Sequence, residues 1–372
     1  MKKDSIAITG AAGFIGKHLL KDLKAAGLPA VGITRSGVDG TCAVGDLGDR
    51  PRWEECLQGV DTVIHCAAVA HKPLTDDTKE IEYLYQVNVN AVETLAEACL
   101  QLGVRRLAFM SSVKVYGEST SGRAAFRETD PLVPEDHYGQ SKLQAEAILD
   151  DYANRGLQVC SLRLPLVYGP GAKANFLKLK KLALSGLPLP LGSISNRRSL
   201  LSVQNLAKAL NELLIVQHWP HLHMNVADPE PVSVPELVHF IAQSGGKKSR
   251  LFPVPVPLLR LAAKLASRES IVERLAGDLE MDISRLRQSL PSLILTTTQA
   301  GLAAEQIDEH RQIQPALSGP GVSDVTDVCL IRLSGAKISC QHVVEHWLLV
   351  VAVGGCLKLP PVPGFNACLA HQ

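Results

Sequence analysis

A glycine-rich turn near the N-terminus, residues 10–16 (GAAGFIG), constrains the fold of this chain more than any other feature. It directly follows the apolar run at residues 6–8 and opens a segment, residues 15–26, with apolar side chains at helical spacing. Glycines let the backbone turn tightly and approach a pyrophosphate, while a helix N-terminus supplies free N–H groups and the positive end of its dipole. The turn therefore predicts a phosphate-binding loop. Its candidate binding residues are Gly10, Ala12, Gly13, Phe14, Ile15 and Gly16.

Short apolar runs alternate with longer helical patterns between residues 5 and 165. Besides residues 15–26, the segment 84–102 carries apolar residues at helical spacing. This alternation predicts βαβ units with right-handed crossovers, and hence an α/β fold whose parallel sheet is covered on both faces. The predicted strands are residues 6–8, 30–33, 62–64, 107–110 and 159–162.

The character of the chain changes twice along its 372 residues. After the first domain, residues 1–170, proline and glycine become common and helical stretches dominate. This change indicates a smaller second lobe, residues 171–304, whose chain partly returns to the first domain. From about residue 305 helical periodicity is lost, and four of the nine cysteines fall within the last 44 residues. We therefore treat residues 305–372 as a C-terminal extension.

Composition excludes several classes of partner. A net charge of +1 provides no general field that would attract nucleic acid or an anionic membrane. Apolar runs are far shorter than the roughly 20 residues of a membrane-spanning helix. No signal-peptide hydrophobic region fits before Gly10, so we expect a cytoplasmic protein. The cysteines include no C-x-x-C pair, so we expect reduced thiols, no metal site and no disulfide framework.

A tyrosine and a lysine, Tyr138 and Lys142, are spaced four residues apart, which places them on one face of a helix. A free phenol has a pKa of about 10, and lowering it to about 7 requires roughly 4 kcal/mol of differential interaction. The ammonium, the helix dipole and the charge of a cofactor would supply this energy jointly. Tyr138 then exchanges a proton with a substrate hydroxyl or carbonyl.

The G-x-x-G-x-x-G spacing of residues 10–16, together with Ser112 placed 26 residues before Tyr138, resembles the extended short-chain dehydrogenase/reductase family, the NAD-dependent epimerase/dehydratases. The resemblance covers residues 5 to about 300. It implies an NAD(P)-dependent enzyme with a Rossmann-type doubly wound parallel sheet and a smaller mixed C-terminal substrate lobe. It also implies that Ser112, Tyr138 and Lys142 are catalytic. Ser112 would hydrogen-bond the reacting oxygen, with Ser111 as its rival, and Lys142 would hold the nicotinamide ribose. The further cofactor-binding residues that it implies are Asp46, Leu47, Ala67, Ala68, Asn88 and Pro165.

The end of the second predicted strand bears on the choice of cofactor. NAD-dependent enzymes usually carry an acid there, which binds the ribose hydroxyls, whereas this chain has Thr34, Arg35 and Ser36. No carboxylate in this stretch would repel a 2′-phosphate, and Arg35 can pair with one. We therefore predict NADP as the cofactor, with NAD as the alternative if Arg35 is only an exposed loop residue.

The same resemblance implies a nucleotide-sugar substrate, because UDP-galactose 4-epimerase typifies this branch. Asn175 resembles part of the segment that cradles the substrate diphosphate. Arg198 matches the arginine that grips the diphosphate, and a guanidinium can engage phosphate oxygens bidentately. Tyr116 either lines the sugar pocket or packs in the core. Leu166 departs from the epimerase pattern, which has an asparagine in that stretch.

Three reactions compete within this branch. A 4,6-dehydratase has an Asp-Glu pair beside the catalytic hydroxyl, where this chain has Val113 and Lys114, so we do not expect dehydration. Arg35 favours NADPH, and the motifs at residues 111–115, 173–176 and 196–200 resemble those of bacterial reductases. The predicted function is therefore C4 reduction of a UDP-4-keto-6-deoxy-N-acetylhexosamine in surface polysaccharide (O-antigen) biosynthesis. The alternatives are a UDP-glucose/UDP-N-acetylglucosamine 4-epimerase with tightly bound NAD, and a non-catalytic dinucleotide-binding regulator. The resemblance also implies a homodimer.

Overall fold

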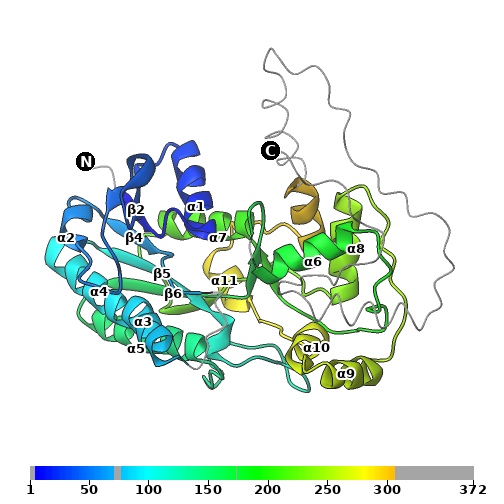
Figure 1. The fold of residues 1–372 in the computed structure, drawn as a ribbon. Coiled ribbons are helices and arrows are strands. Elements are labelled where there is room, and N and C mark those ends of the chain that lie inside the picture. Colours follow the sequence, from blue (N-terminus) through cyan, green and yellow to red (C-terminus); the bar gives the residue numbers. More distant parts are fainter. Residues whose placement is uncertain (1–4, 71–76, 173, 306–372) are drawn as a thin grey trace, which may run out of the picture.

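The computed structural model of the protein describes residues 5–70, 77–172 and 174–305. The expectations for the C-terminal extension, 305–372, fall outside these residues except at residue 305 itself. Figure 1 shows two lobes side by side, one built on a sheet with helices on both sides and one of mixed structure.

Seven parallel strands form the sheet of the first lobe, in the order β3-β2-β1-β4-β5-β6-β9. The strand order reverses between β1 and β4, and in such sheets ligands bind at the carboxyl ends of the strands beside this point. All five predicted strands are present within two residues at each end, so the Rossmann-type doubly wound fold is confirmed. The strands are β1 (Ile6–Thr9), β2 (Ala30–Thr34), β3 (Cys42–Ala43), β4 (Thr62–His65), β5 (Arg106–Ser112), β6 (Gln158–Leu164) and β9 (His223–Asn225).

Helices cover both faces of this sheet, and each face has its own apolar cluster (Figure 1). One cluster joins the strands to α1 (Phe14–Ala25), α7 (Val203–Ile215) and α11 (Ser284–Ser289). The other joins them to α2 (Trp53–Cys56), α4 (Ala91–Leu102) and α5 (His137–Asn154). Burial of these apolar side chains, at about 25 cal/mol per Å², is the main stabilising contribution to such a layered fold.

The predicted helix at 84–102 is present but interrupted. The helix α3 (Thr78–Tyr85) is followed by a π-helical turn, η2 (Gln86–Asn90), and then by α4. A π turn accommodates one extra residue per turn and is found mostly at functional sites. The apolar pattern continues through it, so hydrophobic periodicity did not reveal the interruption. The turn directs the side chain of Asn88 into the protein, where it is buried.

The second lobe contains a two-stranded parallel sheet of β7 (Leu166–Tyr168) and β8 (Leu200–Ser202). Around an apolar cluster that includes Phe176 and Leu237 lie α6 (Ala174–Leu184) and α8 (Val234–Ser244), with α9 (Val256–Leu265) and α10 (Glu269–Ala276) alongside. Between α7 and α8 the chain returns to the first lobe and adds β9 to its sheet. The domain boundary near residue 170 remains a prediction.

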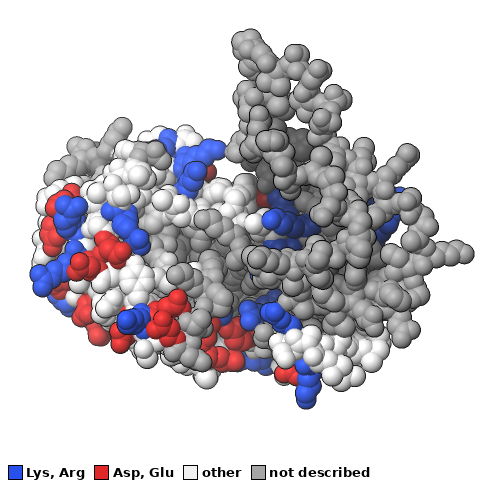
Figure 2. Space-filling view, viewed as in Figure 1, with Lys and Arg blue, Asp and Glu red and all other residues white. Residues whose placement is uncertain are grey.

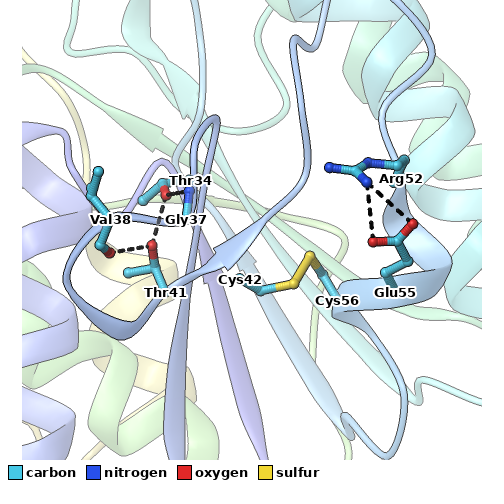
Figure 3. The surroundings of a disulfide bond; sticks show 8 residues. All are labelled: Thr34, Gly37, Val38, Thr41, Cys42, Arg52, Glu55 and Cys56. Atoms are coloured by element: carbon cyan, nitrogen blue, oxygen red, sulfur yellow. Dashed lines mark hydrogen bonds and ion pairs between the residues drawn. A yellow bond between two sulfur atoms is a disulfide. The ribbon is translucent and has the colours of Figure 1, made fainter.

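A disulfide joins Cys42 of β3 to Cys56 of α2, with 5.7 Å between their Cα atoms (Figure 3). The expectation of reduced thiols throughout was therefore wrong for this pair. The two cysteines are 14 residues apart and carry no spacing signature, but β3 and α2 lie side by side at the edge of the sheet. The short helix η1 (Val38–Gly40) precedes β3. Within the described residues, Cys66, Cys99 and Cys160 carry free thiols.

Candidate active site

A cleft of about 720 Å³ opens at the carboxyl ends of β1, β2 and β4, beside the point where the strand order reverses. Seven predicted cofactor-binding residues line it, and they are Gly10, Ala12, Gly13, Arg35, Leu47, Ala67 and Ala68. Sequence reasoning missed Trp53, Tyr83 and Val87, which also line the cleft. These side chains come from helices, and nothing in their local sequence indicates that they face a ligand.

The glycine turn forms a cradle that side chains would fill. Gly10 adopts a positive φ of 65°, and a Cβ at this position would lie 2.8 Å from the Ala67 nitrogen. A Cβ on Gly16 would collide with the Gly10 carbonyl oxygen. Gly13 is the N-cap residue of α1 and carries no side chain that would cap the first N–H groups. The turn and the first residues of α1, Phe14 and Ile15, therefore fit the diphosphate of a dinucleotide.

A carboxylate lies beside the arginine that was expected to select NADP. Arg35 Nε is 3.4 Å from Asp46 Oδ2, and the Tyr83 hydroxyl donates to Asp46 Oδ1 at 3.0 Å. The N–H of Gly48, then Tyr83 and Arg35, hold the pKa of Asp46 below its usual value. The expectation that no carboxylate lies near a 2′-phosphate bound at Arg35 was therefore wrong. Folding brings Asp46 to Arg35, although the two residues are eleven positions apart in the sequence. The predicted contact of Asp46 with adenine remains a prediction.

Tyr138 and Lys142 lie on one face of α5, as their spacing predicted, with Lys142 Nζ 5.9 Å from the centroid of the Tyr138 ring. The ammonium is buried, donates to the Met110 carbonyl oxygen at 2.9 Å, and lies 4.5 Å from the centroid of the Phe109 ring. Burial lowers the pKa of Lys142 to about 8. The same surroundings keep His65 neutral, because burial and then Lys142 lower the pKa of His65 to about 3.

The phenol of Tyr138 is not acidified by the protein alone. Burial, followed by the nearby Asp136 carboxylate, raises the pKa of Tyr138 to about 12. The expected lowering requires the ammonium, the helix dipole and a cofactor's charge together, and in the protein by itself desolvation of the phenolate outweighs the first two. Tyr138 is therefore protonated at neutral pH in the protein alone.

The side chains of Ser111 and Ser112, at the end of β5, have different surroundings, because successive side chains of a strand face opposite sides of the sheet. Ser111 is buried and its hydroxyl donates to Glu146 Oε1 at 2.5 Å. Ser112 begins the short helix η3 (Val113–Val115), and its Oγ accepts only the backbone N–H of Lys114, at 3.3 Å, among the bonds of the described residues. This difference supports Ser112 over Ser111 as the catalytic candidate.

Two other predicted cofactor residues lie behind this site. Asn88 accepts the Val69 N–H at 2.8 Å and donates to the Val69 carbonyl oxygen and to Ser141 Oγ, each at 3.1 Å. It thus ties the loop after β4 to α5, which is a supporting position. Pro165 is buried between β6 and β7.

The predicted substrate-binding residues differ in burial and in hydrogen-bond partners. Tyr116 is buried, and its hydroxyl donates to Asn225 Oδ1 and accepts from Arg163, each at 2.8 Å, so the structure favours the packing alternative. Arg198 is half-buried and donates to the Gly277 carbonyl oxygen at 2.8 Å. Burial lowers its pKa, against the nearby Glu118 and Asp278 carboxylates. Asn175 lies in α6, but its side chain falls outside what the structure describes.

A buried ion pair that sequence reasoning missed supports the end of β5. Arg163 of β6 and Glu146 of α5 are 2% and 1% exposed, and their side chains meet at 2.7 Å. Glu146 also accepts a hydrogen bond from the Ser111 hydroxyl, and Arg163 also donates one to the Tyr116 hydroxyl. Such a pair is costly to break because one partner would be left as an uncompensated buried charge. No local motif marks it, since the two residues belong to different elements.

Charged side chains of both signs are interspersed over the first lobe on the face that Figure 2 shows. Within the described part of the chain, no helix has the length and apolar character required to cross a bilayer.

The sheet, the glycine-lined cleft at its switch point, and a tyrosine–lysine pair on the adjoining helix together define an NAD(P)-dependent enzyme of the epimerase/reductase type. The model of the NAD dependent epimerase/dehydratase family matches residues 6–227, and the chain belongs to this family.

Two 4-epimerases and one solved structure with UDP-glucose and NAD are among the similar proteins. A UDP-glucose 4-epimerase of Vibrio cholerae is 36% identical over 77% of this chain and 89% of that protein. An N-acetyl-alpha-D-glucosaminyl-diphospho-ditrans,octacis-undecaprenol 4-epimerase of Escherichia coli O157:H7 is 29% identical over 68% of this chain and 76% of that protein. The solved structure of MoeE5 in complex with UDP-glucose and NAD has a TM-score of 0.66 and 27% identity, covering 83% of this chain and 99% of that one.

Proposed function

We propose that the protein is a 4-epimerase of a UDP-linked hexose or N-acetylhexosamine that works with bound NAD. The observation that carries this proposal is the tyrosine–lysine pair beside the dinucleotide cleft, in a chain 36% identical to a UDP-glucose 4-epimerase over most of both proteins. The sequence alone favoured C4 reduction of a 4-keto sugar. That preference depended in part on Arg35 selecting NADPH, and the ion pair between Arg35 and Asp46 weakens this part of it.

The arrangement supports proton transfer at the sugar O4. A dinucleotide held by the glycine turn and the cleft would supply hydride acceptance at C4 and return of the hydride to the opposite face, with no net consumption of cofactor. Tyr138 takes the proton from O4 and gives it back, while Ser112 hydrogen-bonds the same oxygen. Lys142 stabilises the phenolate form of Tyr138 by its charge.

The charges near Arg35 bear on the choice between NAD and NADP. The Asp46 carboxylate, beside Arg35, disfavours a 2′-phosphate by like-charge repulsion. We therefore propose NAD in place of NADP, which agrees with the NAD of the MoeE5 complex. Arg198 is the proposed partner of the substrate diphosphate, because its planar guanidinium can bind phosphate oxygens bidentately. A homodimer is still a proposal.

One assay distinguishes the three functions. The purified protein is incubated with UDP-glucose, UDP-N-acetylglucosamine or a UDP-4-keto-6-deoxy-N-acetylhexosamine, each with and without NAD(P)H, and the products are separated by anion-exchange chromatography. We expect 4-epimers of the first two substrates without reduced cofactor. Stoichiometric NAD(P)H consumption with the keto sugar alone would establish the reductase. Dinucleotide binding without any product would establish a regulator.

A further inference from the structure

Lys114 lies directly beyond the catalytic strand end, in η3, and its ammonium holds two carboxylates. Lys114 Nζ donates to Glu118 Oε1 at 2.5 Å and to Asp136 Oδ2. Burial by itself lowers the pKa of Lys114, but the hydrogen bonds that it donates to Asp136 and Glu118 outweigh burial and raise it. The ammonium is therefore charged at neutral pH and compensates nearby negative charge.

One of these carboxylates begins the helix that carries Tyr138. Asp136 is the N-cap of α5, and its Oδ1 accepts the Gly139 N–H at 2.7 Å while Oδ2 faces Lys114. The backbones of η3 and α5 also touch, since a Cβ on Gly139 would lie 2.7 Å from the Lys114 carbonyl oxygen. Lys114 thus joins the element that carries Ser112 to the element that carries Tyr138.

Asp136 is also the negative charge that acts on Tyr138. Lys142 Nζ lies 5.9 Å from the centroid of the Tyr138 ring, one turn further along α5. The other charged or titratable groups near these residues are Glu146 on α5, Cys66 and His65 at the end of β4, Glu118 after η3, Glu135 beside the Glu118 N–H, Arg198 near Glu118, and His137 beside Tyr85 of α3. Within the described residues, the charged group that contacts the Asp136 carboxylate is the Lys114 ammonium.

We propose that Lys114 is a positioning residue for Tyr138: it neutralises the Asp136 carboxylate and fixes the first turn of α5 against the end of β5. This role is separate from contact with the substrate, and it rests on the proposed proton transfer by Tyr138. It predicts that Lys114 governs the pH at which the enzyme becomes active.

The test is the pH profile of kcat/KM for epimerisation. In Lys114→Gln the uncompensated Asp136 charge opposes ionisation of Tyr138, so we expect the profile to move to alkaline pH by about one unit, with about tenfold lower kcat/KM at neutral pH. Lys114→Arg, which keeps the charge, should restore most of the wild-type profile. An unshifted profile in Lys114→Gln, with only a uniform loss of rate, would overturn the proposal.

A double variant separates this role from a purely structural one. Asp136→Asn keeps an N-cap side chain but removes its charge. In Lys114→Gln/Asp136→Asn we therefore expect the profile to return to that of the wild type, and this variant is informative even if the single variant does not fold. A persistent alkaline shift in the double variant would show that Asp136 is not the intermediary and would overturn the proposal. Thermal unfolding of each variant reports its folding.

Lys208→Gln is the matched control. Its ammonium also bridges two protein groups, the Ile294 carbonyl oxygen and Thr296 Oγ1, but it lies on α7, on the face of the sheet opposite α5. We expect its pH profile to be that of the wild type. A readout that does not depend on turnover is tyrosine ¹³Cζ NMR of the NAD-bound protein, with Tyr138 assigned by Tyr138→Phe. If wild type turns over no UDP-sugar, the proposed function fails, while an alkaline Tyr138 titration in Lys114→Gln still supports this inference.

Discussion

Tyr138 is held in surroundings that favour its protonated form, so the choice between phenol and phenolate depends on the groups placed around it. Removing its hydroxyl leaves the aromatic packing in place but deletes the proton-transfer group. We expect Tyr138→Phe to lower kcat by about 10²–10⁴-fold. Steady-state epimerisation kinetics measure this loss. Dinucleotide affinity, followed by fluorescence titration, should change little, and a variant that keeps its turnover would contradict the catalytic assignment.

Lys142 carries a buried ammonium, and this burial has a cost in stability. Its pKa is about 8 in the folded protein against about 10.4 in an unfolded chain. Below pH 8 both states bind the proton, and the folded state is disfavoured by about 3 kcal/mol relative to a neutral group. Between pH 8 and 10.4 the unfolded chain binds more protons, so this penalty disappears as pH rises.

We therefore expect Lys142→Met to raise the free energy of unfolding at pH 7 while abolishing turnover, since Met has a similar length and no charge. The gain should decline as pH rises from 8 toward 10. Urea unfolding at several pH values measures it, and Met substitution at the exposed Lys208 serves as a reference. A stability difference that does not vary with pH would contradict this account of the Lys142 pKa.

At the scale of elements, the features best predicted from the sequence were those that depend on a local pattern of residues. Periodicity located the five longest strands of the sheet, and the i, i+4 spacing placed Tyr138 and Lys142 on one helix face. The strands β3, β7, β8 and β9 have only two or three residues, too few for a periodic signal. The ion pair of Arg35 with Asp46 and the effect of burial on Tyr138 depend on tertiary contacts, which no local pattern contains.

The disulfide between β3 and α2 constrains the edge of the sheet beside the cleft, since Val44, Leu47 and Trp53 lie within the loop that it closes. A cross-link that closes a loop of this length stabilises a protein by about 3 kcal/mol, mainly by restricting the unfolded chain. We expect Cys42→Ser/Cys56→Ser to lose about this much free energy of unfolding, measured by urea denaturation. A dithiol reductant should reproduce the loss in the wild type and have no effect on the double variant. If the oxidised wild type, the reduced wild type and the double variant were equally stable, the presence of the Cys42–Cys56 disulfide would be contradicted.

At the scale of the whole molecule, the sheet of the first lobe is completed by a strand from beyond residue 170. β6 pairs on one side with β5 and on the other with β9, which arrives only after β7, α6, β8 and α7. A fragment that ends at residue 170 would leave β6 as an exposed edge and would lack α7, which covers one face. We expect fragment 1–170 to aggregate or to unfold without a cooperative transition, as judged by circular dichroism. Fragment 1–305 should fold and remain active, whereas a cooperatively folded 1–170 would contradict this interdependence.

The late arrival of β9 has a consequence for synthesis on the ribosome. Once β6 has emerged, residues 165–222 must still be translated before its last partner strand exists, which takes on the order of several seconds at ~5–20 residues per second. The glycine turn and the strands around it have emerged long before then. The nascent chain thus has the parts of its dinucleotide-binding half well before the sheet is complete, and chaperones that shield unpaired strand edges would act on it during this interval.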